Sequence, residues 1–321
     1  MEPLAPSEPS ATFIGALRGR SIVSSLDLTA SETLSVIEAG LRLKAAGLKG
    51  EHPLRSQCLA MIFEKQSCRT RVTFETAMVQ LGGHPIYLTQ ADIGLGTRET
   101  VPDIAKNLSR WVQGIIARTF AHGTVVQLAE NASVPVINAL SDLEHPCQAL
   151  ADFMTIVERA GTAKGFTLAW IGDGNNVCHS LMLTGVRLGA RIQVATPAGY
   201  EPDPAVVGAA IAAGHETGGS VALFDDPAQA AAGAGAVYTD VWTSMGQEAE
   251  RAQRLRDFTG FQVDRRLMDA AANGAFFLHC LPAHRGEEVS AEVIDGPDSA
   301  VFDEAENRLW VQKALLAMTM G

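Results

Sequence analysis

The sequence has few cysteines, no basic leader and no long apolar run, and each of these absences excludes a class of protein. Five cysteines are present, none of them in a C-x-x-C pair: Cys58, Cys68, Cys147, Cys178 and Cys280. This odd, widely spaced set is typical of thiols in a reducing compartment and argues against a disulfide framework. No apolar run approaches the roughly 18 residues that a membrane helix needs. We therefore expect a cytoplasmic protein that does not span a membrane.

The chain also lacks an excess of positive charge. Its formal net charge is −11 and its isoelectric point is near 5.2, which argues against a general nucleic-acid-binding surface. Any site for a phosphate must then be local. At 321 residues the chain is long enough for two domains of ordinary size, each with its own core.

Strand and helix patterns alternate from one end of the chain to the other. The predicted strands are Leu59–Phe63, Pro85–Leu88, Gly114–Phe120, Val134–Leu140, Thr167–Ile171, Arg191–Ala195, Val221–Phe224, Ala236–Val241 and Ala275–Leu281. The most distinct predicted helices are Ser31–Leu43, Val72–Leu81, Val101–Trp111, His145–Arg159 and Ala305–Met320. Such alternation predicts parallel sheets covered on both faces. We expect two doubly wound α/β domains in sequence.

One short polar stretch, Ser67 to Arg71, lies between a predicted strand and a predicted helix. Free backbone N–H groups and the helix dipole favour an anion at such a helix start. The planar fork of Arg69 suits phosphate oxygens, whereas Arg71 has Glu75 as a partner one turn later. The stretch predicts a phosphate site; the alternative is an ordinary surface helix start with a polar cap.

Further polar and reactive groups follow other predicted strands, where parallel sheets bind their ligands. They are Arg118, His145 with Gln148, Asn175 with Asn176, Asp240 to Met245, and Cys280-Leu281-Pro282. Each has an ordinary structural alternative, such as a helix cap for the asparagines or a core position for the cysteine. Their common position at strand ends favours a single site.

Taken in order, these motifs resemble the aspartate/ornithine carbamoyltransferase family across nearly the whole chain. The motifs are Phe63-Glu64-Lys65 running into Ser67-Cys68-Arg69-Thr70-Arg71, His145-Pro146-Cys147-Gln148, Asp173-Gly174-Asn175-Asn176, Asp240-Val241-Trp242-Thr243-Ser244-Met245-Gly246, His279-Cys280-Leu281-Pro282 and Phe302-Asp303-Glu304-Ala305-Glu306-Asn307-Arg308. The first two resemble the carbamoyl-phosphate site of the whole family. The Ser-Met-Gly loop and the His-Cys-Leu-Pro strand are similar to the ornithine branch.

The resemblance implies transfer of a carbamoyl group from carbamoyl phosphate to the δ-amine of L-ornithine, without a cofactor and without a metal. It implies a carbamoyl-phosphate-binding domain over residues 1–150 together with the C-terminal helix, about 305–321, and an ornithine-binding domain over residues 151–304. It assigns carbamoyl phosphate to Ser67, Cys68, Arg69, Thr70, Arg118, His145, Gln148, Cys280, Leu281 and Arg308. Arg118 and His145 would polarise the carbonyl, because preorganised donors stabilise a developing oxyanion.

For ornithine, the resemblance assigns four residues: Asn176, Asp240, Ser244 and Met245. Asn176 would bond the carboxylate, Asp240 would accept the α-ammonium group, and the loop of Ser244 and Met245 would close over the site. Together with Arg118 and His145, the catalytic residues would be Asp240 and Cys280, placed beside the δ-amine. Cys280 would orient that amine or assist its deprotonation; covalent catalysis is the alternative.

Two departures from the family pattern concern the phosphate site. Cys68 stands where many relatives have threonine, so one hydroxyl donor is lost while the backbone N–H remains. The family forms homotrimers in which a loop of the neighbouring subunit reaches the phosphate site. The matching stretch here is Gln90 to Thr97, with Gly94 where some relatives have a polar side chain.

Three alternatives stay open at this point. The stretch Ile171 to Val177 resembles a dinucleotide fingerprint and suggests a dehydrogenase, although its third glycine is missing. A non-catalytic member of the family is a second alternative. A third keeps the chemistry but uses an acylated ornithine, putrescine or aspartate as the acceptor.

Overall fold

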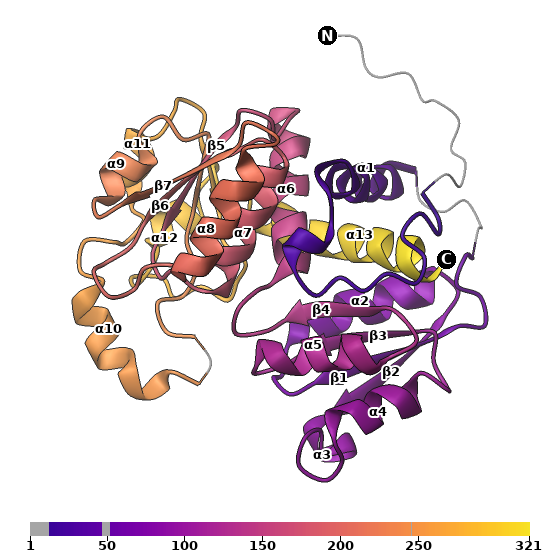
Figure 1. Ribbon diagram of the computed structural model, residues 1–321. Helices are drawn as coiled ribbons and strands as arrows, with labels where there is room; N and C mark the ends of the chain where they lie inside the picture. Colours follow the sequence, from indigo (N-terminus) through magenta and orange to yellow (C-terminus); the bar gives the residue numbers. More distant parts are fainter. Residues whose placement is uncertain (1–12, 47–51, 245) are drawn as a thin grey trace.

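Two parallel β-sheets form the framework of the molecule (Figure 1). The computed structural model describes residues 13–46, 52–244 and 246–321. Strands of the first sheet are β1 (Cys58–Phe63), β2 (His84–Thr89), β3 (Gly114–Arg118) and β4 (Val136–Leu140), in the order β2-β1-β3-β4. Strands of the second sheet are β5 (Thr167–Ile171), β6 (Arg191–Ala195), β7 (Ser220–Phe224), β8 (Ala236–Tyr238) and β9 (Phe276–Leu278), in the order β7-β6-β5-β8-β9.

Helices connect these strands and cover both faces of each sheet. Those of the first half are η1 (Ser25–Asp27), α1 (Ala30–Ala46), α2 (Cys68–Gln80), α3 (Gln90–Ile93), α4 (Val101–Leu108), α5 (His122–Asn131) and α6 (Pro146–Ala160). Those of the second half are α7 (Asn176–Arg187), α8 (Pro204–Gly214), α9 (Pro227–Ala231), η2 (Glu248–Glu250), α10 (Arg251–Asp257), α11 (Arg265–Ala270), α12 (Ala291–Ile294) and α13 (Val301–Met320). The predicted two doubly wound α/β domains are confirmed.

Alternation along the strands separates the core into layers. In β1, Leu59 and Met61 belong to the largest buried cluster, whereas Ala60 and Ile62 face a second cluster under α4 and α5. In β5, Trp170 faces the largest cluster and Ile171 faces a third one, under α9, α11 and α12. Successive side chains point to opposite faces of a strand. The largest cluster contains residues from strands of both sheets, so one continuous core joins their inner faces.

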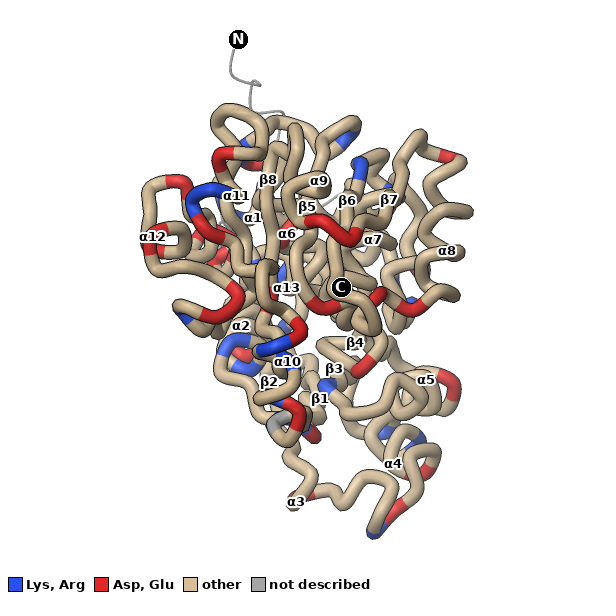
Figure 2. Tube along the Cα trace, turned by 90° about the vertical axis from the view of Figure 1, so that its left-hand side faces the viewer, with Lys and Arg blue, Asp and Glu red and all other residues tan. Residues whose placement is uncertain are grey.

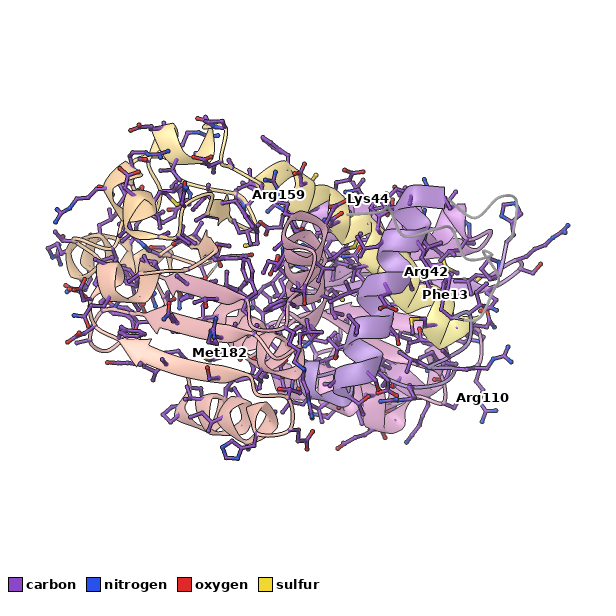
Figure 3. The ribbon with its side chains drawn as sticks, turned by 90° about the horizontal axis from the view of Figure 1, so that it is seen from above. Phe13, Arg42, Lys44, Arg110, Arg159 and Met182 are labelled. Carbon is purple, nitrogen blue, oxygen red and sulfur yellow. The ribbon has the colours of Figure 1, made fainter. Side chains whose placement is uncertain are left out.

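The C-terminal helix α13 returns to the first domain, as predicted. It packs against α1, α2 and α6, and Figure 3 shows α1 and α13 next to each other. Leu315, Leu316 and Met318 are buried there. Lys44 of α1 bonds Asn307 at 2.9 Å and Glu158 of α6 at 3.0 Å, which ties three helices together. The last twenty residues thereby belong to the packing of the first half.

Several element boundaries differ from the predictions. Strands β8 and β9 stop at Tyr238 and Leu278, before the predicted ends at Val241 and Leu281. Helix α4 stops at Leu108, three residues before the predicted end at Trp111, which lies beyond it with 68% of its surface exposed. The predicted loop after β2 contains the single-turn helix α3, which ends at Gly94 in the left-handed conformation. The early ends of β8 and β9 free the following residues from the sheet ladder.

Acidic segments are scattered over both domains (Figure 2), in keeping with the net charge of −11. Within the described parts of the chain, no helix is long and apolar enough to cross a membrane. The five cysteines are all free thiols.

Candidate active site

The start of α2 builds an anion-binding corner directly after β1. Ser67 is the N-cap, and its hydroxyl accepts a hydrogen bond from the backbone N–H of Thr70 at 3.2 Å. Cys68 opens the helix and is exposed. Arg71 points to the surface and pairs with Glu75 at 2.8 Å, as predicted from the spacing. The remaining N–H groups of the first turn are free to meet an anion because a helix cannot satisfy them itself.

Three arginines converge on this corner from separate elements: Arg69 of α2, Arg118 of β3 and Arg308 of α13. Arg308 of α13 is buried; its guanidinium donates to Thr70 Oγ1 at 3.1 Å and to the side-chain oxygen of Gln148. Arg118, at the end of β3, is also buried, and its Nε has no hydrogen-bond partner. Burial, together with the charges of Arg308 and Arg69, lowers the pKa of Arg118 to about 10. Mutually repelling cations with an unused N–H form a site that a phosphate dianion would stabilise.

His145 lies beside these arginines as the N-cap residue of α6. It is buried, its backbone N–H donates to Ser180 Oγ at 2.8 Å, and its ring Nδ1 has no partner. Burial lowers the pKa of His145 well below 6.5, and the neighbouring arginines act in the same direction. The imidazole is therefore neutral at pH 7, and its free nitrogen is available to a ligand.

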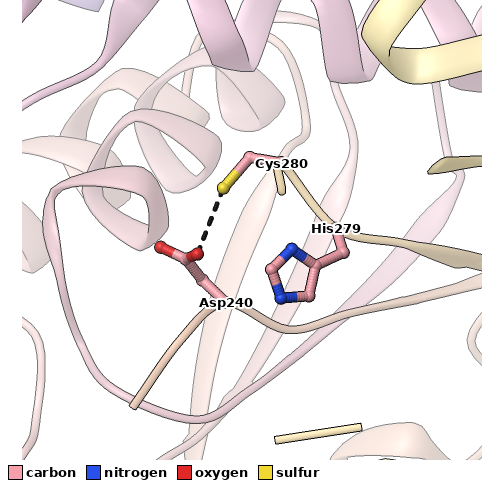
Figure 4. Close-up of side chains that lie close together, drawn as sticks. All are labelled: Asp240, His279 and Cys280. Carbon is pink, nitrogen blue, oxygen red and sulfur yellow. Dashed lines mark hydrogen bonds between the residues drawn. The ribbon is translucent and has the colours of Figure 1, made fainter. Parts of the chain in front are cut away.

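A thiol and a carboxylate meet at the edge of the second sheet. Cys280, two residues after β9, donates a hydrogen bond to Asp240 Oδ1 at 3.1 Å (Figure 4). Asn175 donates to the other oxygen of Asp240 at 2.9 Å. Burial and the negative charge of Asp240 raise the pKa of the Cys280 thiol well above its usual range. The sulfur therefore keeps its proton, which makes it a poor nucleophile in the free protein.

Leu281 connects the two groups of residues. Its carbonyl accepts a hydrogen bond from Arg69 of α2, although the residues lie 212 positions apart. Its φ of 58° is in the left-handed region, and its peptide bond to Pro282 is cis. The Leu281 carbonyl thus faces α2 while the neighbouring Cys280 thiol faces Asp240. The anion-binding corner and the thiol–carboxylate pair therefore share one site between the sheets.

Of the predicted ornithine-binding residues, Asn176 and Ser244 make hydrogen bonds to other groups, and Met245 cannot be placed. The Asn176 side chain donates to the carbonyl of Ser141. The Ser244 backbone N–H is bonded to Gln247 Oε1 at 3.0 Å. Met245 lies outside the described residues. The predicted ornithine contacts of these three residues stay predictions.

The site includes carboxylates that the sequence patterns did not single out. Asp152 and Glu304, both buried, accept hydrogen bonds from the side-chain nitrogen of Gln148 at 2.8 and 3.0 Å. Asp152 is one helical turn after Gln148, and Glu304 is one turn before Arg308. That i,i+4 spacing is the signal that could have identified them.

The glycine-containing loop after β5 does not present a dinucleotide site. The Asn175 side chain accepts hydrogen bonds from the N–H groups of Val177 and Cys178 at 2.9 and 3.1 Å. These donors at the start of α7 are therefore already used. The Gly174 position is also closed, because a Cβ there would lie 2.2 Å from the nitrogen of Pro202.

Among the residues that the structure describes, two groups of side chains have the composition of metal ligands. Asp240, His279 and Cys280 offer ligand atoms within 4.8 Å of one another, as do His284, Glu287 and Glu288. In the first group the Cys280 thiol donates a hydrogen bond to Asp240 Oδ1 at 3.1 Å. In the second, Glu287 is already paired with Arg251.

A surface depression of about 630 Å³ opens beside Ser67 and Cys68. Its lining comes from the ends of β1 and β2 and the start of α2: Phe63, Glu64, Gln66, Ser67, Cys68, Arg71, Tyr87, Thr89, Gln90 and Ala91. The start of α2 is thus open to solvent at this depression.

Fold and site together define a two-domain α/β protein in which an arginine cluster faces a thiol–carboxylate pair. Residues 20–158 match the family model for the aspartate/ornithine carbamoyltransferase carbamoyl-P binding domain, and residues 164–319 match the model for the Asp/Orn binding domain. The chain belongs to the aspartate/ornithine carbamoyltransferase family.

Individual relatives are similar over almost their full length. The ornithine carbamoyltransferase of Pyrococcus horikoshii is 52% identical over 96% of this chain and 98% of its own. The anabolic ornithine carbamoyltransferase of Pyrococcus furiosus is 51% identical over 96% and 99%. Among solved structures, the P. furiosus enzyme has a TM-score of 0.92 at 51% identity, covering 95% of this chain and 98% of that one. The Thermus thermophilus enzyme has a TM-score of 0.84 at 45% identity, covering 94% and 99%.

Proposed function

We propose that this protein transfers the carbamoyl group of carbamoyl phosphate to the δ-amino group of L-ornithine, which yields L-citrulline and phosphate. One observation carries the proposal: Arg69, Arg118 and Arg308 surround the start of α2, while Asp240 and Cys280 lie across from them and Leu281 links the two groups. The first group suits a phosphate dianion and the second suits a primary amine. The named relatives agree with this reaction.

In this proposal, carbamoyl phosphate lies with its phosphate at the start of α2. Ser67, the Cys68 backbone, Arg69 and Thr70 bind the phosphate oxygens, and Arg308 completes the cluster. Arg118 and neutral His145 donate to the carbonyl oxygen, where negative charge develops as the amine attacks. Each such preorganised donor contributes about 3 kcal/mol to transition-state stabilisation. Gln148 holds the carbamoyl amide, and phosphate leaves with the electron pair of the broken C–O bond.

The acceptor is positioned from the second domain. A primary alkylamine has a pKa of about 10.4, so the δ-ammonium must lose a proton before it can attack. Asp240 and Cys280 line the position proposed for this group. Because the thiol holds its own proton against Asp240, direct attack by the amine fits better than a covalent intermediate on Cys280. Asn176, Ser244 and Met245 would bind the amino-acid end of ornithine.

The same proposal divides the chain by substrate. Residues 1–150, with the C-terminal helix of about 305–321, would bind carbamoyl phosphate, and residues 151–304 would bind ornithine. We also propose a homotrimer in which the Gln90–Thr97 loop of a neighbouring subunit closes the depression beside Cys68. Exposed apolar side chains on α2 and β2, among them Val72, Val79 and Ile86, support an interface near this face.

The proposed setting is arginine biosynthesis in the cytoplasm. The biosynthetic direction is suggested by the P. furiosus relative, which is named anabolic. The free thiols fit a reducing compartment.

The test is citrulline formation by the purified protein with carbamoyl phosphate and L-ornithine, with N-acetyl-ornithine, putrescine and aspartate assayed in parallel. We expect product from ornithine only. Product from another amine would overturn the acceptor assignment and the expected contact of Asp240 with the α-ammonium group. Folded protein that is inactive with every amine would favour a non-catalytic member of the family.

A further inference from the structure

A buried pair of carboxyl groups lies behind the phosphate corner. Asp152 of α6 and Glu304 of α13 are completely buried. Both accept hydrogen bonds from one nitrogen, Gln148 Nε2, so their oxygens lie close together. Two buried anions in this position would repel each other strongly. A single shared proton removes that repulsion.

The hydrogen bonds identify which carboxyl group stays ionised. Glu304 accepts three: from Gln148, from the Tyr238 hydroxyl at 3.0 Å and from the His279 backbone N–H at 2.9 Å. Asp152 accepts one, and its Oδ2 has no partner. Donors stabilise the anionic form, so the negative charge belongs on Glu304 and the proton on Asp152.

The charges around the pair agree with this assignment. Burial and the charge of Glu304 raise the pKa of Asp152 well above its usual range, while Arg308 opposes this. Burial also raises the pKa of Glu304, and hydrogen bonds from its neighbours together with the charge of His279 offset only part of that rise. Arg308 and His279 are the positively chargeable neighbours of the pair, and Tyr238 packs against it as a neutral donor.

The pair controls the orientation of the Gln148 amide. Its nitrogen faces the two carboxyl groups, so its oxygen faces Arg308 and accepts a hydrogen bond from it. Arg308 then directs its second nitrogen to Thr70 in the first turn of α2. The chain from Glu304 to Thr70 thus fixes two groups assigned above to carbamoyl phosphate. The hydrogen bond from the His279 backbone to Glu304 extends this chain of contacts to the segment that carries Cys280.

We propose that Asp152 and Glu304 are positioning residues that share one proton and hold Gln148 and Arg308 in the orientation that binds carbamoyl phosphate. This inference rests on the proposed function. Neither residue touches the substrate; both act through Gln148.

The experiment compares two isosteric variants by steady-state kinetics. Asp152→Asn keeps a neutral group that can both donate and accept, so the KM for carbamoyl phosphate should stay within about threefold of wild type. Glu304→Gln places an NH₂ group among three donors, so this KM should rise about 30-fold, as expected for the loss of a hydrogen bond to a buried charge. The KM for ornithine should change less than about threefold in both variants, which separates positioning from general damage.

Asp303→Asn is the matched control, because Asp303 is the exposed neighbour of Glu304 on α13 and pairs with Arg159 at the surface. It should leave both KM values unchanged. If Glu304→Gln does not fold, Tyr238→Phe removes one donor to the Glu304 carboxylate and should raise the KM for carbamoyl phosphate about tenfold. Equal losses in Asp152→Asn and Glu304→Gln, or an unchanged KM in folded Glu304→Gln, would overturn the proposal. Wild-type protein that makes no citrulline would instead refute the proposed function.

Discussion

Replacing Arg69 by alanine tests the proposed phosphate corner most directly. Arg69 lies in the first turn of α2, partly exposed, and bonds the carbonyl of Leu281. Its guanidinium can reach two phosphate oxygens, and each charge-assisted hydrogen bond contributes roughly 1.5–3 kcal/mol. Its removal also relieves repulsion with Arg118, which lowers the net loss. We estimate a net loss of about 3 kcal/mol, which corresponds to a decrease of about 100-fold in kcat/KM for carbamoyl phosphate.

The stability of the protein should change little, because Arg69 is not buried in the core. We expect a Tm within about 3 °C of wild type, since about 1 kcal/mol shifts Tm by a few degrees in a chain of this size. Arg69→Lys keeps the charge but loses the fork, and we expect a decrease in kcat/KM of about tenfold. Arg42→Ala is the control: Arg42 is exposed on α1 and pairs only weakly with Glu38 at 3.7 Å (Figure 3).

The assay is citrulline formation at varied carbamoyl phosphate and saturating ornithine, with Tm measured on each variant. Folded Arg69→Ala with kcat/KM within about threefold of wild type would refute the phosphate corner, because the lost charge-assisted bonds predict a far larger effect. An equal loss in Arg42→Ala would also refute it, since that guanidinium lies far from the site.

Three further predictions concern the protonation of buried groups. Cys280→Ala should still form citrulline, with a decrease in kcat of at most about 100-fold, since the proposed amine attack is direct. Iodoacetamide should alkylate Cys280 slowly at pH 8, because the thiol is protonated; rapid alkylation would show a thiolate and contradict this. The His145 imidazole should stay neutral at pH 6 in an NMR titration, because its pKa is lowered in the folded state; an imidazolium signal at pH 6 would contradict this. The unfolded chain then binds a proton that the folded protein does not, so His145 reduces the free energy of unfolding as pH falls below about 6.5. Arg254→Met should lower the free energy of unfolding by about 3–5 kcal/mol at pH 8, because it leaves Asp173 buried without its partner at 2.9 Å. Burial already raises the pKa of Asp173 to about 6. A carboxyl group with a raised pKa in the folded state lowers the free energy of unfolding as pH rises through that pKa, so the loss caused by Arg254→Met should be smaller at pH 5 than at pH 8. Denaturant titrations that give an equal loss at both pH values would contradict the assignment.

The sequence determined the elements and the identity of most site groups. Apolar runs such as Leu59–Phe63 and Thr167–Ile171 predicted strands, because a strand buried on both faces has no polar side to show. The Arg71–Glu75 pair followed from helical spacing alone. The ordered motifs indicated the family, and strand ends indicated where the polar groups gather.

Only the tertiary structure decided how those groups interact. The contact of Arg69 with Leu281 spans 212 positions, and no local spacing encodes it. The early end of β9 and the left-handed conformation of Leu281 were likewise absent from the predictions made from sequence. The proton held by Cys280 and the acid pair of Asp152 and Glu304 result from burial, which removes water from charged groups. Local sequence pattern thus indicated which residues belong to the site, whereas burial and long-range contacts decided their orientation and charge.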